Sequence, residues 1–296
     1  MYYPYLRAKG EEINSLLQLP LKSKVLPILE PVSIKNANVN KFKQLVKNKI
    51  PFIIIINPQV GNISIEEVLE IYVNGVLHDY DNYSIAYIVH NATTQIELQS
   101  FNQIPNRDKF LIHKTNFENV NLLENLNIDF HVFCKDQVSS NYINSITSSN
   151  KIILLDGFKK LQRNADYPLE SFFSDMHFTY EANGFIGIGD YLTQGDNYSL
   201  SGGPAYAVAI HLTVLKNNEV YVRHFISNNR EGNSRVAEKF YEALTHLINY
   251  VDNNTVLETT AIQKYRELYD SRHFPGLSVN KRLSLINHIE QIASII

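Results

Sequence analysis

Short apolar runs rich in β-branched residues alternate with longer polar stretches through the first half of the chain. Six such runs occupy residues 25–29, 52–56, 84–89, 109–112, 130–133 and 152–155. They recur at intervals of roughly 20–30 residues, the length of a βα unit. Apolar residues between the runs follow helical spacing, most plainly in 65–76. This alternation predicts a parallel sheet whose strands are joined by crossover helices.

Two further strands and a hairpin are predicted in the second half. Residues 185–190 form a seventh apolar run, and 205–214 alternate large apolar residues with small or polar ones, the period-two pattern of a strand. Asn217 and Asn218 tolerate positive φ, which predicts a tight turn and a return strand at 220–227. A two-residue turn places His211 directly opposite His224.

The rest of the chain is helical in pattern. Apolar residues recur at helical spacing in 237–251, in 256–268 and from about 279 onward. Eight strands with crossovers favour a TIM-barrel-like (β/α)8 fold of the α/β class, a single domain over 1–296 with the barrel in about 1–230 and C-terminal helices in about 233–296. An open doubly wound parallel sheet is the alternative, because periodicity does not separate the two.

Composition narrows the class of protein. The 296 residues are 44% hydrophobic and 19% charged, enough to bury a full core. The net charge of -3 argues against attraction to nucleic acid or membrane by overall charge. Cys134 is the only cysteine, which fits a reducing compartment. The chain starts without a signal-peptide pattern and has no apolar run of membrane-spanning length, so we expect a cytoplasmic protein with no membrane partner.

Polar residues follow almost every predicted strand, where barrels and open sheets bind ligands. They are Glu30, Asn57, His90, His113, Lys114, Lys135, Asp156 and Asp190. Strands also meet water at these ends, so polar residues are expected there without any function. As a set, the carboxylates Glu30, Asp156 and Asp190 can hold a divalent cation such as Mg²⁺ or Mn²⁺ or activate water. His90, His113 and Lys114 can bind an anion, and Asn57 can contact substrate.

Two other groups can contribute to the same chemistry. The opposed His211 and His224 have side chains close enough to hold one phosphate or one metal ion, although a cross-strand pair of structural histidines is equally compatible with the pattern. Backbone N–H groups at Gly202 and Gly203 can bind an anion, or the Gly-Gly-Pro run can be a plain turn into a strand. Arg7 and Lys9 can fold over the barrel end or remain solvated. No established metal, P-loop or G-x-S-x-G motif accompanies these residues.

Several motifs resemble the beta-protein family, which is found in phages and bacteria. They are residues 3–11 (YPYLRAKGE), 25–31 (VLPILEP), 201–212 (SGGPAYAVAIHL), His224-Phe225 and 273–277 (HFPGL). The resemblance touches the whole length of the chain and is strongest to a branch encoded on bacterial mobile islands. It implies a single-domain barrel that takes part in conflict between phage and host. It also implies a neighbouring-gene partner that is nuclease-like.

Two functions follow as the main hypotheses, and a small-metabolite binder or an enzyme of non-phosphate chemistry is a third that the near-neutral charge allows. The first is a phosphoester hydrolase acting on a nucleotide or nucleic acid in phage defence, in which Glu30, Asp156, Asp190, His211 and His224 are catalytic. The second is a non-catalytic barrel that binds, senses or restrains a partner protein. In that case the surface would be the last helix, whose apolar residues are Leu283, Ile286, Ile289, Ile292 and Ile296.

Overall fold

The computed structural model describes residues 1–20, 24–198, 206–229 and 231–296. The chain divides into two compact units. The barrel unit comprises Met1–Ile13, Leu21–Asp156 and Phe178–Tyr191, and the sheet unit comprises Asn14–Pro20, Gly157–His177 and Leu192–Ile296. The single domain expected over 1–296 stays a prediction. In the described residues, no helix is long and apolar enough to cross a membrane.

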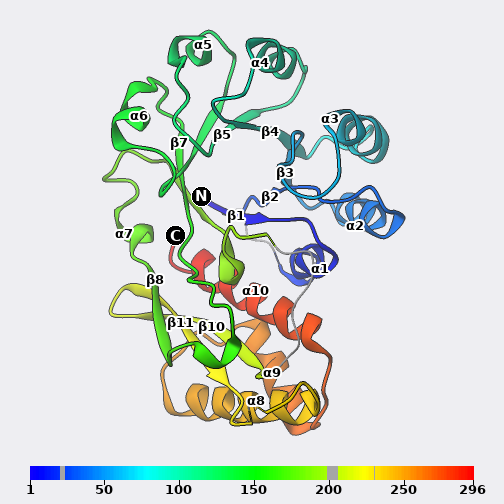
Figure 1. Ribbon diagram of the computed structural model, residues 1–296, viewed down its shortest axis with the longest axis vertical. Coiled ribbons are helices and arrows are strands. Elements are labelled where there is room, and N and C mark those ends of the chain that lie inside the picture. The colour runs from blue at the N-terminus through cyan, green and yellow to red at the C-terminus, as the bar shows by residue number, and fades with distance from the viewer. Residues whose placement is uncertain (21–23, 199–205, 230) are drawn as a thin grey trace. The chain divides into compact units, whose positions relative to one another are not determined.

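Eight parallel strands of the barrel unit close into a barrel (Figure 1). In barrel order they are β1 (Tyr2–Leu6), β2 (Ile28–Leu29), β3 (Phe52–Ile55), β4 (Tyr83–Val89), β5 (Lys109–His113), β6 (Phe130–Cys134), β7 (Lys151–Leu155) and β9 (Gly187–Asp190). The barrel closes because β1 pairs in parallel with both β2 and β9. The predicted TIM-barrel-like fold is confirmed, and the open sheet is excluded.

Crossover helices connect the barrel strands, and α2 to α6 lie outside the barrel (Figure 1). The helices are α1 (Gly10–Gln18), α2 (Asn36–Lys47), α3 (Ile65–Glu67) with the π-helix η1 (Val68–Val76), α4 (Gln95–Asn102), α5 (Val120–Glu124), α6 (Ser140–Ser145) and α7 (Met176–Thr179). Capping boxes begin α3 at Ser64 and α4 at Thr94, where each side chain accepts from the backbone N–H three residues on.

Alternate residues of the strands fill the barrel interior. The inward set includes Tyr3 and Tyr5 on β1 and Phe110 on β5, and the remaining members are mainly Ile, Val, Leu and Ala. Because side chains alternate along a strand, the residues between them face the helices instead. This alternation decides which polar residues at the strand ends point into the opening at the carboxyl ends of the barrel strands, which we call the barrel mouth.

Gly189 allows β9 to approach β1 at the seam of the barrel. A Cβ added at Gly189 would lie 2.4 Å from the carbonyl oxygen of Tyr3, and one added at Gly187 would lie 2.5 Å from the Tyr3 ring. Real Cβ atoms do not approach so closely, so glycine at these positions permits the pairing that closes the barrel.

The first barrel strand, Tyr2–Leu6, was not among the predicted strands. Pro4 lies in its middle, and proline weakens a strand pattern because it lacks the N–H that the ladder uses. In the structure Pro4 pairs in register with Asp190, and every residue of the strand is buried.

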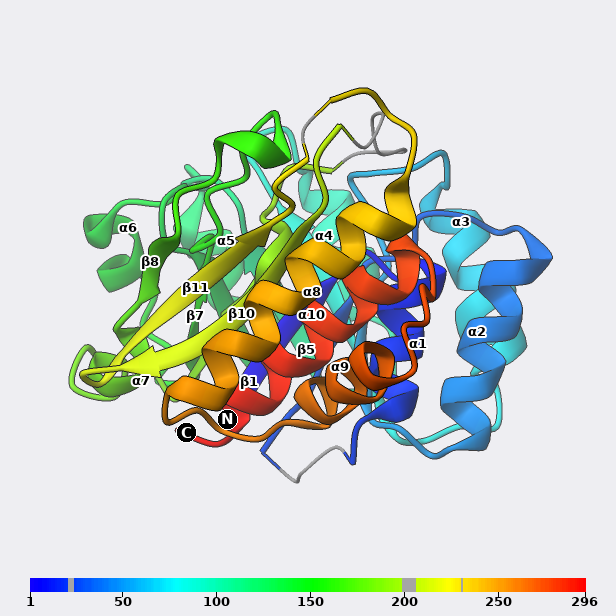
Figure 2. The same cartoon turned by 90° about the horizontal axis from the view of Figure 1, so that it is seen from below.

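The sheet unit holds an antiparallel sheet of three strands, ordered β10-β11-β8. Its elements are η2 (Asn164–Asp166), β8 (Glu170–Ser174), η3 (Leu192–Gln194), β10 (Ala209–Lys216), β11 (Glu219–Ile226), α8 (Val236–Asn253), α9 (Thr260–Asp270) and α10 (Leu277–Ala293). Helices α8 and α10 run alongside the hairpin of β10 and β11 (Figure 2). The predicted turn is confirmed: Asn217 and Asn218 have φ of 53° and 61°, and His211 pairs with His224.

The expectation that 205–214 forms the eighth barrel strand is wrong. The strand β10 belongs to the antiparallel sheet, and β1 takes the missing place in the barrel. The physical reason lies in the pattern itself. Parallel barrel strands are buried on both faces and read as continuous apolar runs, whereas clean alternation is typical of an antiparallel sheet. The barrel strands accordingly end at Asp190 rather than near residue 230.

Helix α10 covers the open edge of β10 instead of forming an exposed surface. Asn280 donates from Nδ2 to the carbonyl oxygen of Ala209 at 3.1 Å, and the Oδ1 of Asn287 accepts from the N–H of Thr213 at 2.7 Å. These bonds satisfy backbone groups that an edge strand leaves unpaired. The apolar side of the helix is buried too, at Leu283, Ile286, Ile289 and Ile292. The surface expected for a partner protein is therefore not exposed there.

Candidate functional site

Inward-facing residues at the carboxyl ends of the barrel strands form the candidate site, because barrels bind ligands at this end. Strand alternation continues past the last interior residues to the next inward positions. These positions are Arg7, Glu30, Asn57, His90, Lys114, Asp136, Asp156 and Tyr191. Six of these eight residues are among the site residues predicted from the sequence. The other two are Asp136, which is exposed, and Tyr191, which packs in the barrel core.

Glu30 is fully buried and its carboxylate is held from three directions. Its Oε2 forms an ion pair with Nη1 of Arg7 and accepts from the Tyr5 hydroxyl at 2.6 Å. Its Oε1 accepts from the backbone N–H of Gln59 at 2.7 Å. A carboxylate with this many partners is suited to fixing the position of Arg7, whose guanidinium stays charged at any physiological pH.

Two cations share one pair of aromatic rings in the barrel mouth. The centroids of Tyr5 and Tyr191 are 4.8 Å apart. The Arg7 guanidinium carbon lies 4.9 Å from the Tyr5 centroid and 5.6 Å from that of Tyr191. The Lys114 Nζ lies 5.6 Å and 5.4 Å from the same two centroids. Arg7 and Lys114 therefore both make cation–π contacts with the same pair of rings.

The Tyr5 side chain of this group remains a neutral phenol. Burial raises the pKa of Tyr5 well above its usual value, and the adjacent Glu30 carboxylate raises it further. The hydroxyl of Tyr191 lies 3.6 Å from Sγ of the buried Cys134. Cys134 is buried and thus belongs to the interior packing.

Asn57, His90 and Asp156 end three other strands at this face. The Asn57 side chain donates to the carbonyl of Ile88 at 2.8 Å and accepts from its N–H at 2.7 Å, so it extends the strand ladder. His90 is half-buried, and Asp156 is exposed. His90 and Asp156 are thus accessible titratable residues at inward positions, as are the half-buried Lys114 and the exposed Asp136.

His113 and Asp190 lie on the opposite side of their strands, facing the helices. The fully buried His113 contacts the Tyr142 hydroxyl at 2.8 Å through Nδ1 and Nδ1 of His131 at 3.0 Å through Nε2. Burial lowers the pKa of His113 well below its usual value. The carboxylate of Asp190 accepts from the Tyr2 hydroxyl at 2.9 Å. The structure therefore does not bring these two residues together with Arg7 and Lys114.

The remaining predicted residues lie elsewhere. Lys9 precedes α1, and its carbonyl oxygen accepts from the N–H of Ile13 at 3.0 Å. Gly202 and Gly203 lie outside the described residues. The pair His211 and His224 belongs to the sheet unit, where the two Nδ1 atoms are 2.8 Å apart.

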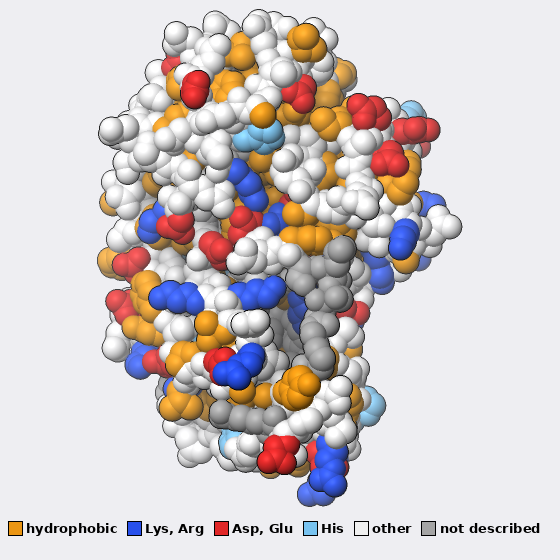
Figure 3. All heavy atoms as spheres, viewed as in Figure 1, with side chains coloured by type: hydrophobic (Ala, Val, Ile, Leu, Met, Phe, Trp, Pro, Cys, Tyr) orange, Lys and Arg blue, Asp and Glu red, His pale blue; other side chains and the backbone are white. Residues whose placement is uncertain are grey.

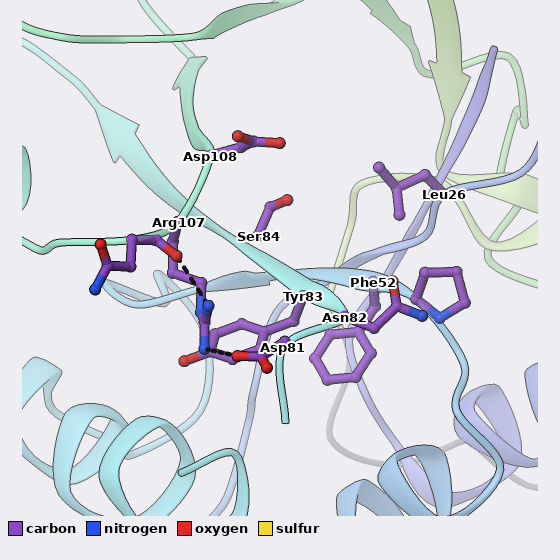
Figure 4. Close-up of a pocket in the computed structure, with 10 residues that line it drawn as sticks. Leu26, Phe52, Asp81, Asn82, Tyr83, Ser84, Arg107 and Asp108 are labelled. Atoms are coloured by element: carbon purple, nitrogen blue, oxygen red, sulfur yellow. Dashed lines mark hydrogen bonds and ion pairs between the residues drawn. The ribbon is translucent and has the colours of Figure 1, made fainter. Parts of the chain in front are cut away.

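The structure adds a cavity at the amino ends of β3, β4 and β5 that the sequence did not predict. It measures about 330 Å³, and Phe52, Tyr83 and Arg107 are among its lining residues (Figure 4). Arg107 lies over the Tyr83 ring, 4.4 Å from its centroid, and forms an ion pair with Asp81 at 3.2 Å. Polar contacts at this end of a barrel usually serve stability, so we assign this cavity no function.

The distribution of charged side chains and the scarcity of grouped metal ligands limit which ligands the described residues could bind. The face drawn in Figure 3 carries Lys and Arg side chains mixed with Asp and Glu, without one continuous basic field. Within the described part of the chain, no three His, Cys, Asp or Glu side chains are grouped so that they could hold a metal ion. The side chains at this end of the barrel that could bind an anion by charge are therefore Arg7 and Lys114.

Sequence reasoning missed Tyr5, Tyr191, His131 and Ser171. Tyr5 and Arg7 share a face because they are two residues apart on one strand, and that signal was lost with the unpredicted strand β1. Ser171, which contacts His224, lies on β8, in a stretch that shows no clear strand pattern. Only the pairing of β8 with β11 reveals that contact.

Comparisons with known proteins return no relative. The sequence matches no family model, no curated protein and no solved structure. The function therefore has to be argued from the site itself, and the family resemblance of the sequence motifs stays a prediction.

Proposed function

We propose that the carboxyl end of the barrel binds the phosphate of a nucleotide or nucleic acid and that the protein hydrolyses a phosphoester bond there. One observation carries the proposal: Arg7 and Lys114 both lie over the ring pair of Tyr5 and Tyr191. A guanidinium binds two phosphate oxygens at once, and an ammonium adds a point charge. The ion pair with Glu30 supports the proposal because it fixes the guanidinium before the ligand arrives.

His90 and Asp156 are the candidates for activating water. One of them would accept a proton while the water oxygen attacks phosphorus, and the ester oxygen would leave with the bonding electrons and take up a proton. Arg7 and Lys114 would stabilise the negative charge on the phosphoryl oxygens during this step. Glu30 would position Arg7 and would not act as the base, because both of its oxygens are hydrogen-bonded.

The biological setting rests on the resemblance to the beta-protein family alone. We propose a cytoplasmic component of a phage–host conflict system that works with a nuclease-like partner. A purely non-catalytic role with a partner protein is less well supported, because the apolar side of α10 is buried. Purification of the protein with the product of the neighbouring gene would test the partner directly.

A titration experiment tests the phosphate site. We expect a nucleoside monophosphate and inorganic phosphate to bind to the native protein in a calorimeter. We expect Lys114→Ala to weaken both at least about tenfold, because a charge-assisted contact contributes about 1.5–3 kcal/mol. Lys47→Ala, which removes an exposed lysine of α2, is the matched control and should bind normally. No binding to the native protein, or equal affinity in Lys114→Ala, would contradict the proposal.

An activity assay tests hydrolysis separately. Nucleotide and oligonucleotide panels, with and without Mg²⁺ or Mn²⁺, should show release of phosphate or of shortened product. Asp156→Asn and His90→Gln should identify the base, since loss of one base lowers the rate about 10²–10⁴-fold while binding remains. Binding without turnover of any phosphoester would leave a phosphate-binding barrel and contradict the hydrolase.

A further inference from the structure

Three polar side chains form a chain of hydrogen bonds across the three-stranded sheet. Oγ of Ser171 on β8 lies 2.8 Å from Nε2 of His224 on β11. The Nδ1 of His224 lies 2.8 Å from Nδ1 of His211 on β10. Neighbouring strands thus supply one member each, all on one face of the sheet. Strands hold side chains more rigidly than loops do, so the hydrogen-bonded chain of Ser171, His224 and His211 has a fixed geometry.

The order of the atoms matches that of a nucleophile, a base and an orienting group. In hydrolases of this kind a serine hydroxyl contacts Nε2 of histidine, and a third group holds the other ring nitrogen. Here His211 takes the third place. When the Nδ1–H of His224 donates to His211, the Nε2 of His224 carries a lone pair and accepts from the Ser171 hydroxyl.

We propose that Ser171, His224 and His211 form a hydrolytic triad that cleaves carboxylic esters by acyl transfer to Ser171. Neither the sequence motifs nor the phosphate site in the barrel unit requires this activity, and the proposal does not depend on them. It assigns Ser171 as nucleophile, His224 as general base and acid, and His211 as the positioning residue.

The reaction balances with water as the only co-reactant. Oγ of Ser171 attacks the ester carbonyl carbon while its proton moves to Nε2 of His224. The alcohol leaves with that proton, and an acyl ester remains on Oγ. Water then attacks the acyl carbon and passes a proton to Nε2, after which the carboxylic acid leaves and Oγ recovers the proton.

The surroundings keep both rings neutral and fixed. The Tyr167 ring stacks on His224 with centroids 4.6 Å apart, and the Phe158 and Tyr167 rings contact His211 edge-on at 5.1 Å and 4.8 Å. Burial, together with the charge of the nearby Arg223, lowers the pKa of His224 to about 4. At neutral pH His224 is therefore in the neutral form, which is the form that can accept a proton from the Ser171 hydroxyl.

Exposure at the site indicates the class of substrate. Ser171 is partly exposed, although His224 is only 3% exposed. Leu169 lies two residues before Ser171, so it projects from the same side of the chain, and it is 74% exposed. An exposed leucine beside the nucleophile favours an ester with an apolar acyl group.

A fluorophosphonate probe with an alkyl chain tests the nucleophile. Such a probe forms an Oγ–phosphorus bond and releases fluoride only where a serine is activated. We expect one adduct, located on Ser171 by peptide mass mapping, and no adduct in Ser171→Ala. His224→Gln should lower the labelling rate at least about 100-fold, because it removes the base. Ser174→Ala is the matched control on β8, since the Oγ of Ser174 accepts from the N–H of Met176.

A second measurement keeps the proposal testable if a variant folds poorly. Native protein should hydrolyse p-nitrophenyl butyrate with an initial burst of p-nitrophenol, and Lys47→Ala, at an exposed lysine of α2, should retain both this activity and the labelling. His211→Asn should slow labelling and should change its pH dependence, as expected of a positioning residue. Absence of an adduct on native protein, or an equal labelling rate in His224→Gln, would overturn the triad.

Discussion

His211 and His224 lie directly opposite each other on β10 and β11, with 2.8 Å between their Nδ1 atoms. The distance means that one ring donates and the other accepts, so the two imidazoles cannot both be protonated without losing the bond. When both rings are neutral, the Nε2 atom of each ring lies outside this hydrogen bond. Ser171 contacts the Nε2 atom of His224.

The pH dependence of labelling at Ser171 follows from this pair. The groups around His224 are His211, Arg223, Tyr167 and Ser171, and none of them is a carboxylate that would stabilise the imidazolium. With a pKa of about 4, His224 is neutral from pH 5.5 to 8. We expect a labelling rate that is constant over that range and falls by half near pH 4. A midpoint near 6.5 would instead indicate an ordinary, solvated histidine.

Acid destabilisation should also arise from the buried pair His113 and His131. Burial lowers the pKa of His131 to about 4 and that of His113 well below 6.5. Unfolded chains protonate histidine near pH 6.5, so the unfolded state binds more protons as the pH falls below that value. The stability of the neutral pair is therefore complete above about pH 6.5 and is lost between pH 6.5 and 4.

Denaturant unfolding at several pH values measures this effect. Each histidine that stays neutral lowers the free energy of unfolding by up to about 1.4 kcal/mol per pH unit in the window. His131→Gln should make the decline shallower. His78→Gln, which alters an exposed histidine, should leave the slope unchanged. A native protein whose unfolding free energy is flat from pH 7 to 5 would contradict the buried neutral pair.

Local patterns were sufficient for much of the fold. The apolar runs located seven of the eight barrel strands, and the two asparagines fixed the hairpin register that opposes His211 and His224. Long-range pairing was not predictable in the same way. No local sequence pattern indicates that β1 closes the barrel despite Pro4. None indicates that β10 pairs with β11 in a separate sheet rather than in the barrel.

The candidate site shows the same limit at the level of side chains. Sequence alone collected polar residues from strand ends, but only strand alternation separates Lys114, which points inward, from His113, which faces the helices. The partners of Glu30 come from β1 and from the segment after β3, so its role in holding Arg7 depends on tertiary structure. Residue types in the sequence therefore indicated that the site could bind an anion. The orientation of each side chain, which requires the structure, decided which residues belong to the site.

Lys239 should be a major contributor to the stability of the sheet unit. It is completely buried, and its ammonium donates to the carbonyl oxygens of Tyr206, Glu231 and Gly232 at 2.7–2.9 Å. Lys239→Met keeps the apolar stem but leaves three acceptors without their donor. We expect a loss of about 2–5 kcal/mol in the free energy of unfolding. Lys264→Met, at an exposed pair with Glu267, should change it by less than about 0.5 kcal/mol.

Gly189→Ala should disrupt the seam of the barrel. The added methyl group would lie 2.4 Å from the carbonyl oxygen of Tyr3, a backbone atom that cannot move without separating β1 from β9. We expect a loss of about 3 kcal/mol or more, visible as a lower unfolding midpoint and faster amide exchange in β1. Gly10→Ala is the control, because nothing lies within 4 Å of the position of its Cβ. Equal stability of the two variants would contradict the close approach.

The last prediction concerns the ion pair between Arg7 and Glu30. Glu30→Gln retains the size of the side chain but removes the charge that faces the guanidinium of Arg7. Leaving a buried charge without its carboxylate costs about 3–5 kcal/mol, so the unfolding midpoint should fall markedly. Asp156→Asn is the exposed control and should stay within about 0.5 kcal/mol of the native protein.

A double-mutant cycle separates the ion pair from general disruption. If Glu30 serves mainly to hold Arg7, then the variant carrying both Arg7→Leu and Glu30→Leu should lose less stability than the sum of the losses in the two single variants, because no buried charge remains. The same double variant should weaken phosphate binding at least about tenfold, as Lys114→Ala does, since it lacks the guanidinium. Stability that falls additively, with phosphate affinity retained, would show that the pair has neither role. That outcome would leave Lys114 as the sole cation of the proposed site.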